Sequence, residues 1–415
     1  MHSIAYLIEG ISHRLKYHRK MNRAIGLACV LLLLVLETCG AFKGTLPRRF
    51  AGKNRIATKM LFNFGGSSSS IASKSSIPKD KKICVITGTT SGLGLETLRS
   101  LLNTDKYYVV CGCRDVEKMK EIAEREGFNP TSHTVIDLDL GSFDSTKKFV
   151  TKLNNVKKSR PLDRLVCNAA VYQPALDKPK WTEDNIEQQL QINHLSHFLL
   201  CSLLINDMKK AKDPRMIIVG SITGNSNTVG GGAVLPLADL GNLEGMADGS
   251  KNPVAMIDGK TFNGAKAYKD SKICNMMTVN ELHKRYHKST GITFGSMYPG
   301  CIAETQLFRE KRQWFRTIFP LFMKYVTGGY VSQQEAGQRL AQVVDDPVCS
   351  KSGVYWSWNG GAKTIATFDS KGKLSGAGGS GGAIFENQPS AEVSNPVKAK
   401  AMWEYSTAIT GAKWP

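Results

Sequence analysis

A glycine-rich turn between an apolar segment and a helical segment constrains the fold of this chain more than any other feature. The run Thr87-Gly-Thr-Thr-Ser-Gly-Leu-Gly94 follows the apolar residues 82–87 and opens a segment with helical periodicity. Glycine permits a tight turn and lets the backbone approach a diphosphate at the N-terminus of a helix. The spacing therefore predicts a nucleotide-binding turn. Six of its residues are expected to contact the nucleotide: Thr87, Gly88, Ser91, Gly92, Leu93 and Gly94.

Apolar strand-like segments alternate with helical segments along the rest of the chain. Such alternation predicts an α/β, Rossmann-type, doubly wound parallel sheet. We expect a single domain at 80–415, with a long Gly/Asn-rich insertion at 222–263 before the helix that carries the next motif. The predicted strands are 82–87, 107–113, 132–137, 162–167, 216–221, 292–298 and 353–358, and the predicted helices are 92–103, 116–126, 143–156, 182–210, 264–287 and 396–408.

The second predicted strand ends in a basic residue where an acid would indicate NAD. Arg114 lies 20 residues after Gly94, and Lys118 follows one helical turn later. An acidic side chain there would bind the ribose hydroxyls of NAD, whereas an arginine suits the 2′-phosphate of NADPH. The alternative interpretation is a solvated, basic start of a helix. Four residues that follow the third and fourth strands are expected to contact the same cofactor: Asp139, Leu140, Asn168 and Ala169.

A tyrosine and a lysine one helical turn apart form the second motif. Tyr268 and Lys272 share one face of their helix. A free tyrosine has a pKa of about 10 and is a slow acid at neutral pH, whereas a nearby ammonium favours its phenolate. Taken alone, the pair is also typical of an ordinary helix surface. Together with Asn193 in a helix and Ser221 at a strand end, it predicts a proton-transfer site.

The glycine turn and these side chains, in this order, resemble the short-chain dehydrogenase/reductase family. One departure is the distance between Ser221 and Tyr268, which is 47 residues and far more than the family's usual spacing. The insertion between them therefore serves something that this chain's own subfamily needs. The resemblance implies a catalytic tetrad and a nicotinamide-facing turn at these residues: Asn193, Ser221, Tyr268 and Lys272, then Pro299 and Gly300.

Longer strings, including parts of the insertion, resemble the light-dependent protochlorophyllide oxidoreductases. The resemblance covers nearly all of 82–358 and resumes at 385–387. Ser196 replaces a glycine usual in that group, and 360–382 is an extra segment relative to the plant form. The matching strings include Val166-Cys-Asn-Ala-Ala-Val-Tyr172, Asn193-His-Leu-Ser-His-Phe198, Ile217-Ile-Val-Gly-Ser-Ile-Thr-Gly-Asn225, Gly264-Ala-Lys-Ala-Tyr-Lys-Asp-Ser-Lys272, Tyr298-Pro-Gly-Cys-Ile-Ala303 and Gly353-Val-Tyr-Trp-Ser-Trp358.

This second resemblance implies an enzyme that reduces protochlorophyllide to chlorophyllide with NADPH in the light. Hydride would reach C17 of the pigment and a proton would reach C18. Tyr268 would donate the proton, with Lys272 lowering its pKa, Asn193 anchoring a water relay and Ser221 bonding near the substrate. Cys301 would position the pigment or serve as a rival proton donor. Two other functions stay open: a retinol-type reductase of a membrane lipid, and a pigment-binding or storage protein.

The first 79 residues are predicted to be a two-part targeting leader. The uncharged run 24–36 matches the core of a signal peptide at about 21–41, and the acid-free segment 42–79 has the composition of a transit peptide. Together they resemble the plastid leaders of algae with extra plastid membranes, which implies a chloroplast protein of the stroma or the thylakoid surface. The alternative is a plain secretory signal, and either Met1 or Met21 is allowed as the start.

The charge and the cysteines exclude some partners. The formal net charge is +20, but the 13 basic and two acidic residues of the leader account for +11 of it, and no compact basic block follows. Nucleic-acid binding is therefore not expected. The ten cysteines show no C-x-x-C spacing, so no metal site is expected.

Membrane contact after the leader is expected to be peripheral, because no spanning segment is evident there. The aromatic and basic segment 307–330 is predicted to cover the pigment and meet a membrane surface. The alternative is a core helix with a solvated face. A homo-oligomer stays open.

Overall fold

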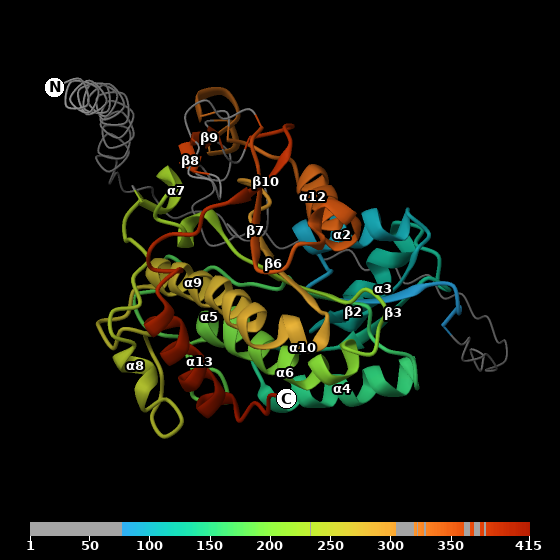
Figure 1. Cartoon of the computed structure of the whole chain (residues 1–415), viewed down its shortest axis with the longest axis horizontal. Helices are drawn as coiled ribbons and strands as arrows, with labels where there is room; N and C mark the ends of the chain where they lie inside the picture. Colours follow the sequence, from blue (N-terminus) through green and yellow to red (C-terminus); the bar gives the residue numbers. More distant parts are fainter. Residues whose placement is uncertain are drawn as a thin grey trace, which may run out of the picture. The chain divides into compact units, whose positions relative to one another are not determined.

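An eight-stranded sheet forms the centre of the folded unit (Figure 1). The computed structural model describes residues 77–232, 234–303, 319–321, 323–327, 329–360, 366–368, 374–376 and 379–415. The predicted leader therefore lies outside the described residues except at 77–79, as does most of the predicted covering segment 307–330.

The strand order confirms the doubly wound prediction. The sheet runs β10-β7-β6-β5-β4-β1-β2-β3, and its pairs are parallel except for the antiparallel pair of β10 and β7. The order reverses between β1 and β4, where ligands of such sheets bind at the carboxyl ends of the strands. The strands are β1 (Lys82–Thr87), β2 (Tyr107–Cys113), β3 (His133–Asp137), β4 (Arg164–Cys167), β5 (Arg215–Val219), β6 (Thr293–Met297), β7 (Val354–Trp358) and β10 (Ile384–Asn387), with β8 (Ala366–Phe368) and β9 (Leu374–Gly376) forming a separate pair.

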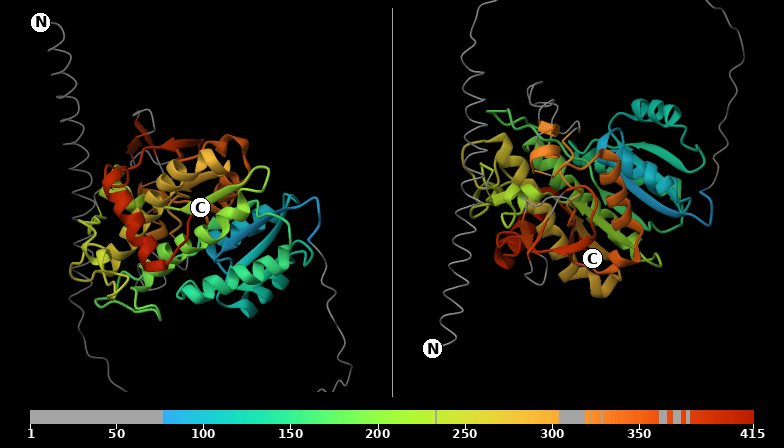
Figure 2. Two further views of the ribbon diagram at one scale, coloured as in Figure 1. Left: turned by 60° about the horizontal axis from the view of Figure 1, so that its bottom comes forward. Right: turned by 90° about the horizontal axis from the view of Figure 1, so that it is seen from above.

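Helices cover both faces of the sheet, and the central strands are apolar on both sides (Figure 2). In β1, Ile83 and Val85 join one core cluster, while Cys84 and Ile86 join the other. The first cluster includes α4, α6, α9 and α13, and the second includes α2, α3 and α12. These helices are α2 (Gly92–Leu102), α3 (Val116–Arg125), α4 (Phe143–Lys157), α6 (Ser196–Met208), α9 (Gly264–Leu282), α12 (Gln333–Asp345) and α13 (Pro396–Thr410).

Short elements fill the connections. The insertion 222–263 leaves the end of β5 and returns at the start of α9, and it carries three of them. In Figures 1 and 2, α13 lies alongside α9 near the end of the chain. The short elements are α5 (Gln188–Leu190), η1 (Gln191–Leu195), η2 (Ile222–Gly224), α7 (Val229–Gly232), α8 (Glu244–Ala247), η3 (His283–His287), α10 (Lys288–Thr290), η5 (Met323–Thr327) and η6 (Pro347–Ser350).

Several elements differ from the sequence prediction. The helix expected from residue 182 begins at Gln188, because Glu187 caps it by accepting a hydrogen bond from the Leu190 N–H at 2.9 Å. Glu187 also forms a β-bridge with Trp181, which holds the preceding residues in an extended hairpin-like turn. The pattern also predicted neither the helix α12 nor the edge strand β10.

Within the described residues, no helix is long and apolar enough to cross a membrane. The same residues contain no group of three or more His, Cys, Asp or Glu side chains that could hold a metal ion.

Candidate active site

The glycine turn lies at the carboxyl end of β1 and starts α2. Gly88 and Gly92 have φ angles of 74° and 57°, in the left-handed region that favours glycine. A Cβ on Gly94 would overlap the carbonyl oxygen of Gly88, so the close crossing of the two backbones requires glycine there. Ser91 stands at the N-cap of α2 without a side-chain cap bond. The N-terminal N–H groups of α2 therefore face the edge where a diphosphate would bind.

Beneath this turn, the Thr87 hydroxyl joins β1 to the segment after β4. Its oxygen accepts hydrogen bonds from the backbone N–H groups of Asn168 and Ala169 at 2.9 and 3.0 Å. The Asn168 side-chain amide in turn donates to the carbonyl oxygens of Thr87 and Gly88 at 2.9 and 3.2 Å. Ala169 lies so near Gly88 that a Cβ there would be 2.9 Å from the Ala169 Cβ. The predicted cofactor residues of these two strands are therefore in direct contact.

A buried histidine that the sequence analysis did not single out completes this arrangement. His197 Nε2 lies 2.9 Å from the Thr87 hydroxyl, and Nδ1 lies 3.1 Å from the carbonyl oxygen of Asn193. Because a carbonyl only accepts, Nδ1 carries the proton and Nε2 accepts from Thr87. Burial, assisted by the charge of Lys272, lowers the pKa of His197 to about 4, so the ring is neutral at physiological pH.

Asn193 holds the segment after β4 through its side chain. Its Oδ1 accepts from the Val171 N–H at 2.8 Å, and its Nδ2 donates to the Val171 carbonyl at 3.0 Å and to the Ser271 hydroxyl at 3.1 Å. Asn193 lies in the π-helical turn η1, a local distortion that is frequent at functional sites. The side chain therefore connects η1, the β4 end and α9.

Tyr268 lies buried on α9, close to Tyr172 and Lys272. Its ring centroid is 4.7 Å from that of Tyr172 and 5.7 Å from Lys272 Nζ. Burial, followed by the effect of Tyr172, raises the pKa of Tyr268, and a hydrogen bond with Ser221 opposes this. Desolvation of the phenol outweighs the opposing hydrogen bond, so the net shift of the Tyr268 pKa is upward, and the effect of Lys272 that the resemblance implied stays a prediction. Tyr268 therefore holds its proton at neutral pH.

Lys272 is anchored from below by the end of β5. Its Nζ donates to the Val219 carbonyl at 3.0 Å, an oxygen that Asn275 Nδ2 also approaches at 3.3 Å. Burial lowers the pKa of Lys272 to about 8. The amine is thus mainly protonated at neutral pH and begins to lose its charge just above it.

Pro299, Gly300 and Cys301 follow β6 at the same edge of the sheet. Gly300 has a φ of 111°, which favours glycine. Arg339 from α12 donates to the Pro299 carbonyl at 3.0 Å and lies over the Trp358 ring at 5.2 Å, a contact that sequence reasoning missed. Burial raises the pKa of the Cys301 thiol to about 12, so Cys301 also keeps its proton.

The remaining predicted cofactor residues occupy the rim of the turn. Arg114 directly follows β2, and both Arg114 and Lys118 are exposed. Asp139 accepts a hydrogen bond from the Gly141 N–H at 2.8 Å. The carbonyl oxygen of the buried Leu140 accepts a hydrogen bond from the Ser196 hydroxyl at 2.7 Å. Leu93 is partly buried against the core on the α2 side.

Comparison with known proteins identifies the family. The family described as short chain dehydrogenase matches residues 82–233. A protein named protochlorophyllide reductase, chloroplastic, from Marchantia paleacea is 53% identical over 335 residues, covering 80% of this chain and 68% of that protein. Protochlorophyllide reductase A, chloroplastic, from Arabidopsis thaliana is 51% identical over 346 residues, covering 81% and 80%. This chain belongs to the protochlorophyllide reductase family.

Another member of the protochlorophyllide reductase family, from Hordeum vulgare, is 46% identical over 388 residues, covering 91% of this chain and 94% of that protein. Among solved structures, an NADPH-bound carbonyl reductase from chicken fatty liver matches 71% of this chain and 98% of its own with a TM-score of 0.49 and 16% identity.

Two residues of the site gave only weak signals in the sequence. His197 stands four residues after Asn193, on the same helical face, and that spacing was visible in the string that ends at Phe198. Arg339 lies on a helix far along the chain and carries no local motif. Its role appears only when α12 packs beside the turn at Pro299.

Proposed function

We propose that this chain reduces protochlorophyllide to chlorophyllide with NADPH, driven by light, in the chloroplast. The observation that carries the proposal is the buried pair of Tyr268 and Lys272, which meets Ser221 at the strand end. Membership of the protochlorophyllide reductase family supports this substrate over a membrane lipid. The net reaction adds two hydrogens across one double bond of the pigment, as a hydride and a proton.

The nicotinamide cofactor fits the residues at the carboxyl ends of β1 and β4. The glycine turn and the uncapped N-terminus of α2 suit the diphosphate, and Lys272 suits the nicotinamide ribose. Arg114 and Lys118 are exposed where a 2′-phosphate would lie, which favours NADPH over NADH. When bound, this cofactor supplies the hydride that reaches C17 of the pigment.

Tyr268 is the proposed donor of the proton to C18. Its raised pKa keeps the phenol fully protonated, and the ammonium of Lys272 on the next turn stabilises the phenolate that forms when the proton leaves. Ser221 hydrogen-bonds to the phenol and holds its position. Cys301 is protonated as well and is the rival donor. Light excitation polarises the double bond of an aromatic macrocycle that resists hydride attack in its ground state.

We further propose a peripheral contact with the thylakoid surface and import through the leader 1–79, cleaved between about 60 and 80. Within the predicted covering segment 307–330, Leu321 and Tyr325 are exposed, as expected for a surface that meets lipid. The same exposed residues would also allow copies of this chain to associate with one another on the thylakoid surface.

Illumination of the purified protein with protochlorophyllide and NADPH tests the function. The expected result is conversion of the pigment absorption to that of chlorophyllide in the light and no change in the dark. Replacement of NADPH by NADH is expected to slow turnover at equal concentration, and Arg114→Ala to reduce that difference. Pigment binding without turnover would favour a storage protein instead. Absence of both, with reduction of a retinol-type lipid, would favour the lipid reductase.

A further inference from the structure

The catalytic helix carries charged residues that the proposed chemistry does not use. Between Tyr268 and Lys272 stand Lys269 and Asp270, and Lys266 lies one turn before Asp270. Lys269 is 4% exposed, and Asp270 is fully buried. Burying charged groups is costly unless each is paired or hydrogen-bonded. The hydrogen-bond partners of these buried side chains therefore indicate their structural role.

All three side chains hold the backbone of one short segment of the insertion. Lys269 Nζ donates to the carbonyl oxygens of Val234 and Pro236 at 2.5 and 2.8 Å. Lys266 Nζ donates to the carbonyl oxygen of Asp239. Asp270 accepts from the N–H of the same residue at 3.0 Å. The insertion is thus attached to α9 at 234–239 by side chains of the helix, which we call the α9 clamp (Lys266, Lys269 and Asp270).

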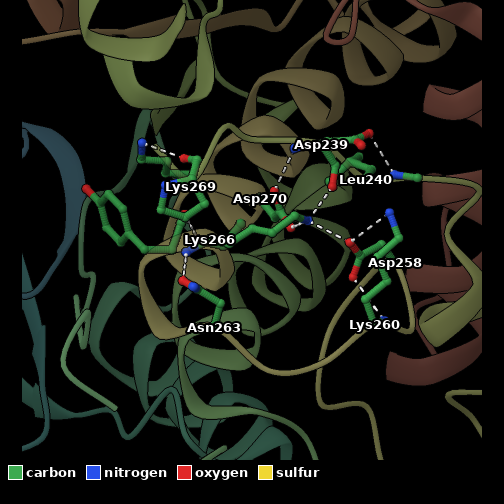
Figure 3. Close-up of polar contacts among 12 residues, drawn as sticks. Asp239, Leu240, Asp258, Lys260, Asn263, Lys266, Lys269 and Asp270 are labelled. Atoms are coloured by element: carbon green, nitrogen blue, oxygen red, sulfur yellow. Dashed lines mark hydrogen bonds and ion pairs between the residues drawn. The ribbon is translucent and has the colours of Figure 1, made fainter. Parts of the chain in front are cut away.

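A second attachment joins the clamp to the end of the insertion. Lys266 Nζ lies 2.9 Å from Asp258 and 2.5 Å from Asp270, and both carboxylates are completely buried. Figure 3 shows Lys266 between these two acids, with Asp239 and Leu240 on one side and Lys260 on the other. One ammonium therefore ties two separate parts of the insertion to the same helix.

The arrangement gives α9 two functional faces. Residues four apart lie on one face, so Tyr268 and Lys272 point together, whereas Lys269 and Asp270 are turned about 100° and 200° away from Tyr268. The same insertion begins just after Ser221, which hydrogen-bonds to Tyr268, and its Gly224 is so close to α9 that a Cβ would be 3.2 Å from the Ile273 nitrogen. The insertion therefore contacts both faces of the catalytic helix.

We propose that Lys266, Lys269 and Asp270 are positioning residues that fix the insertion 222–263 on α9 and thereby set the pigment-binding side of the site. The inference rests on the proposed function, and it assigns the unusual length between Ser221 and Tyr268 to recognition of the tetrapyrrole. The clamp does not touch the turn after β1, so it leaves cofactor binding unchanged.

Lys269→Met tests the clamp, because methionine keeps the length of the side chain and removes the ammonium that holds two carbonyls. The KM for protochlorophyllide is expected to rise about tenfold, as loss of one charge-assisted contact would give. The dissociation constant for NADPH, measured by its fluorescence, is expected to stay within about twofold. Lys269→Arg retains the donors and is expected to restore the KM. Lys251→Met, an exposed site in the same insertion, is the matched control and is expected to behave like the unmodified protein.

Three outcomes would overturn the proposal: an unchanged pigment KM in Lys269→Met, an equal loss of pigment and NADPH binding, or no rescue by Lys269→Arg. Limited proteolysis distinguishes failure of the clamp proposal from failure of the proposed function. Even if the unmodified protein reduced no protochlorophyllide, the clamp predicts faster cleavage within 222–263 in Lys269→Met than in Lys251→Met. Equal cleavage rates would contradict the clamp.

Discussion

The two halves of the active site are built from different kinds of contact. In the cofactor half, which comprises 87–94 and 168–169, a hydroxyl and an amide bond to backbone groups, and glycines allow the close approach. In the substrate half, which comprises α9 and the insertion 222–263, buried charges on the helix bond to the backbone and acids of the insertion. Hydrogen bonds to backbone groups and close glycine packing thus set the first half, and pairing of buried charges sets the second.

Because the contacts differ, we expect substitutions in the two halves to impair different properties of the protein. Changes in the cofactor half should act on NADPH binding or on the folding of the sheet edge. Changes in the substrate half should act on the pigment, on proton transfer or on the dependence of stability on pH.

Tyr268→Phe is expected to have the largest effect. Loss of the proton donor should lower turnover by about 10²- to 10⁴-fold, the usual contribution of a general acid. Binding of NADPH should stay nearly intact, because the phenol belongs to the substrate half. Single-turnover absorbance after a light flash measures the proton step, and Tyr405→Phe on α13 is the matched control. Unchanged turnover in Tyr268→Phe would assign the proton to Cys301 or to water.

Gly94→Ala should damage the cofactor half selectively. The new Cβ overlaps the Gly88 carbonyl, a backbone atom that can yield only if the turn shifts. Overpacking of this size costs about 1–3 kcal/mol, so the affinity for NADPH should fall about tenfold to a hundredfold. Fluorescence titration of NADPH measures the loss, and pigment binding by the same variant is the internal control. An unchanged NADPH affinity would contradict the assigned role of the turn.

Thr87→Val should weaken the fold at the junction of the two strands. The backbone N–H groups of Asn168 and Ala169 and the ring nitrogen of His197 would all lose their shared partner. Leaving buried groups without hydrogen bonds costs about 1–3 kcal/mol, which urea unfolding would detect. Thr89→Val is the control, because the Thr89 hydroxyl donates to the weak acceptor sulfur of Met119. Equal losses in the two variants would argue against a special role for Thr87.

Asp270→Asn should change how stability depends on pH, which is the smallest of the four effects. Burial raises the pKa of Asp270 from 3.8 to about 7, with Lys266 opposing and Asp258 adding to the rise. Between these values the folded protein retains a proton that the unfolded chain releases, so this group makes the free energy of unfolding fall as pH rises. Urea unfolding across this range should show a smaller fall in Asp270→Asn. The exposed Asp248→Asn should keep the original profile, and an identical profile in both variants would refute the assignment.

The glycine turn of the cofactor half was predictable because its residues are consecutive in the sequence, whereas its bonds to Asn168 and Ala169 span 81 and 82 residues. The run from Thr87 to Gly94 predicted the end of a strand, a turn and the start of a helix. The observed strand β1 has the predicted bounds, and α2 starts at Gly92 as predicted. The four tetrad residues follow from the family resemblance and stay predictions, and the structure places Tyr268 near Ser221 and Lys272. The sign of the pKa shift on Tyr268 was not predictable, since it depends on how completely the folded protein removes the phenol from water.

The contacts of the substrate half were harder to predict because pairs of buried charges between α9 and the insertion leave no local sequence pattern. Lys269 and Asp270 were part of a matching string, yet nothing local shows that they bond to a segment about 30 residues earlier. His197 was missed because its bond to Thr87 spans 110 residues, and Arg339 was missed because it carries no local motif. The edge strand β10 was missed because an isolated strand of four residues carries too short a pattern.

The most direct test of the central claim follows deuterium from the cofactor into the pigment. NADPH labelled at the reactive position of the nicotinamide is mixed with the protein and protochlorophyllide in ordinary water, and the product of a light flash is analysed by mass spectrometry. The account predicts chlorophyllide with one deuterium at C17 and an unlabelled hydrogen at C18, formed only after illumination. Formation of chlorophyllide without deuterium, or its formation in the dark, would contradict the account.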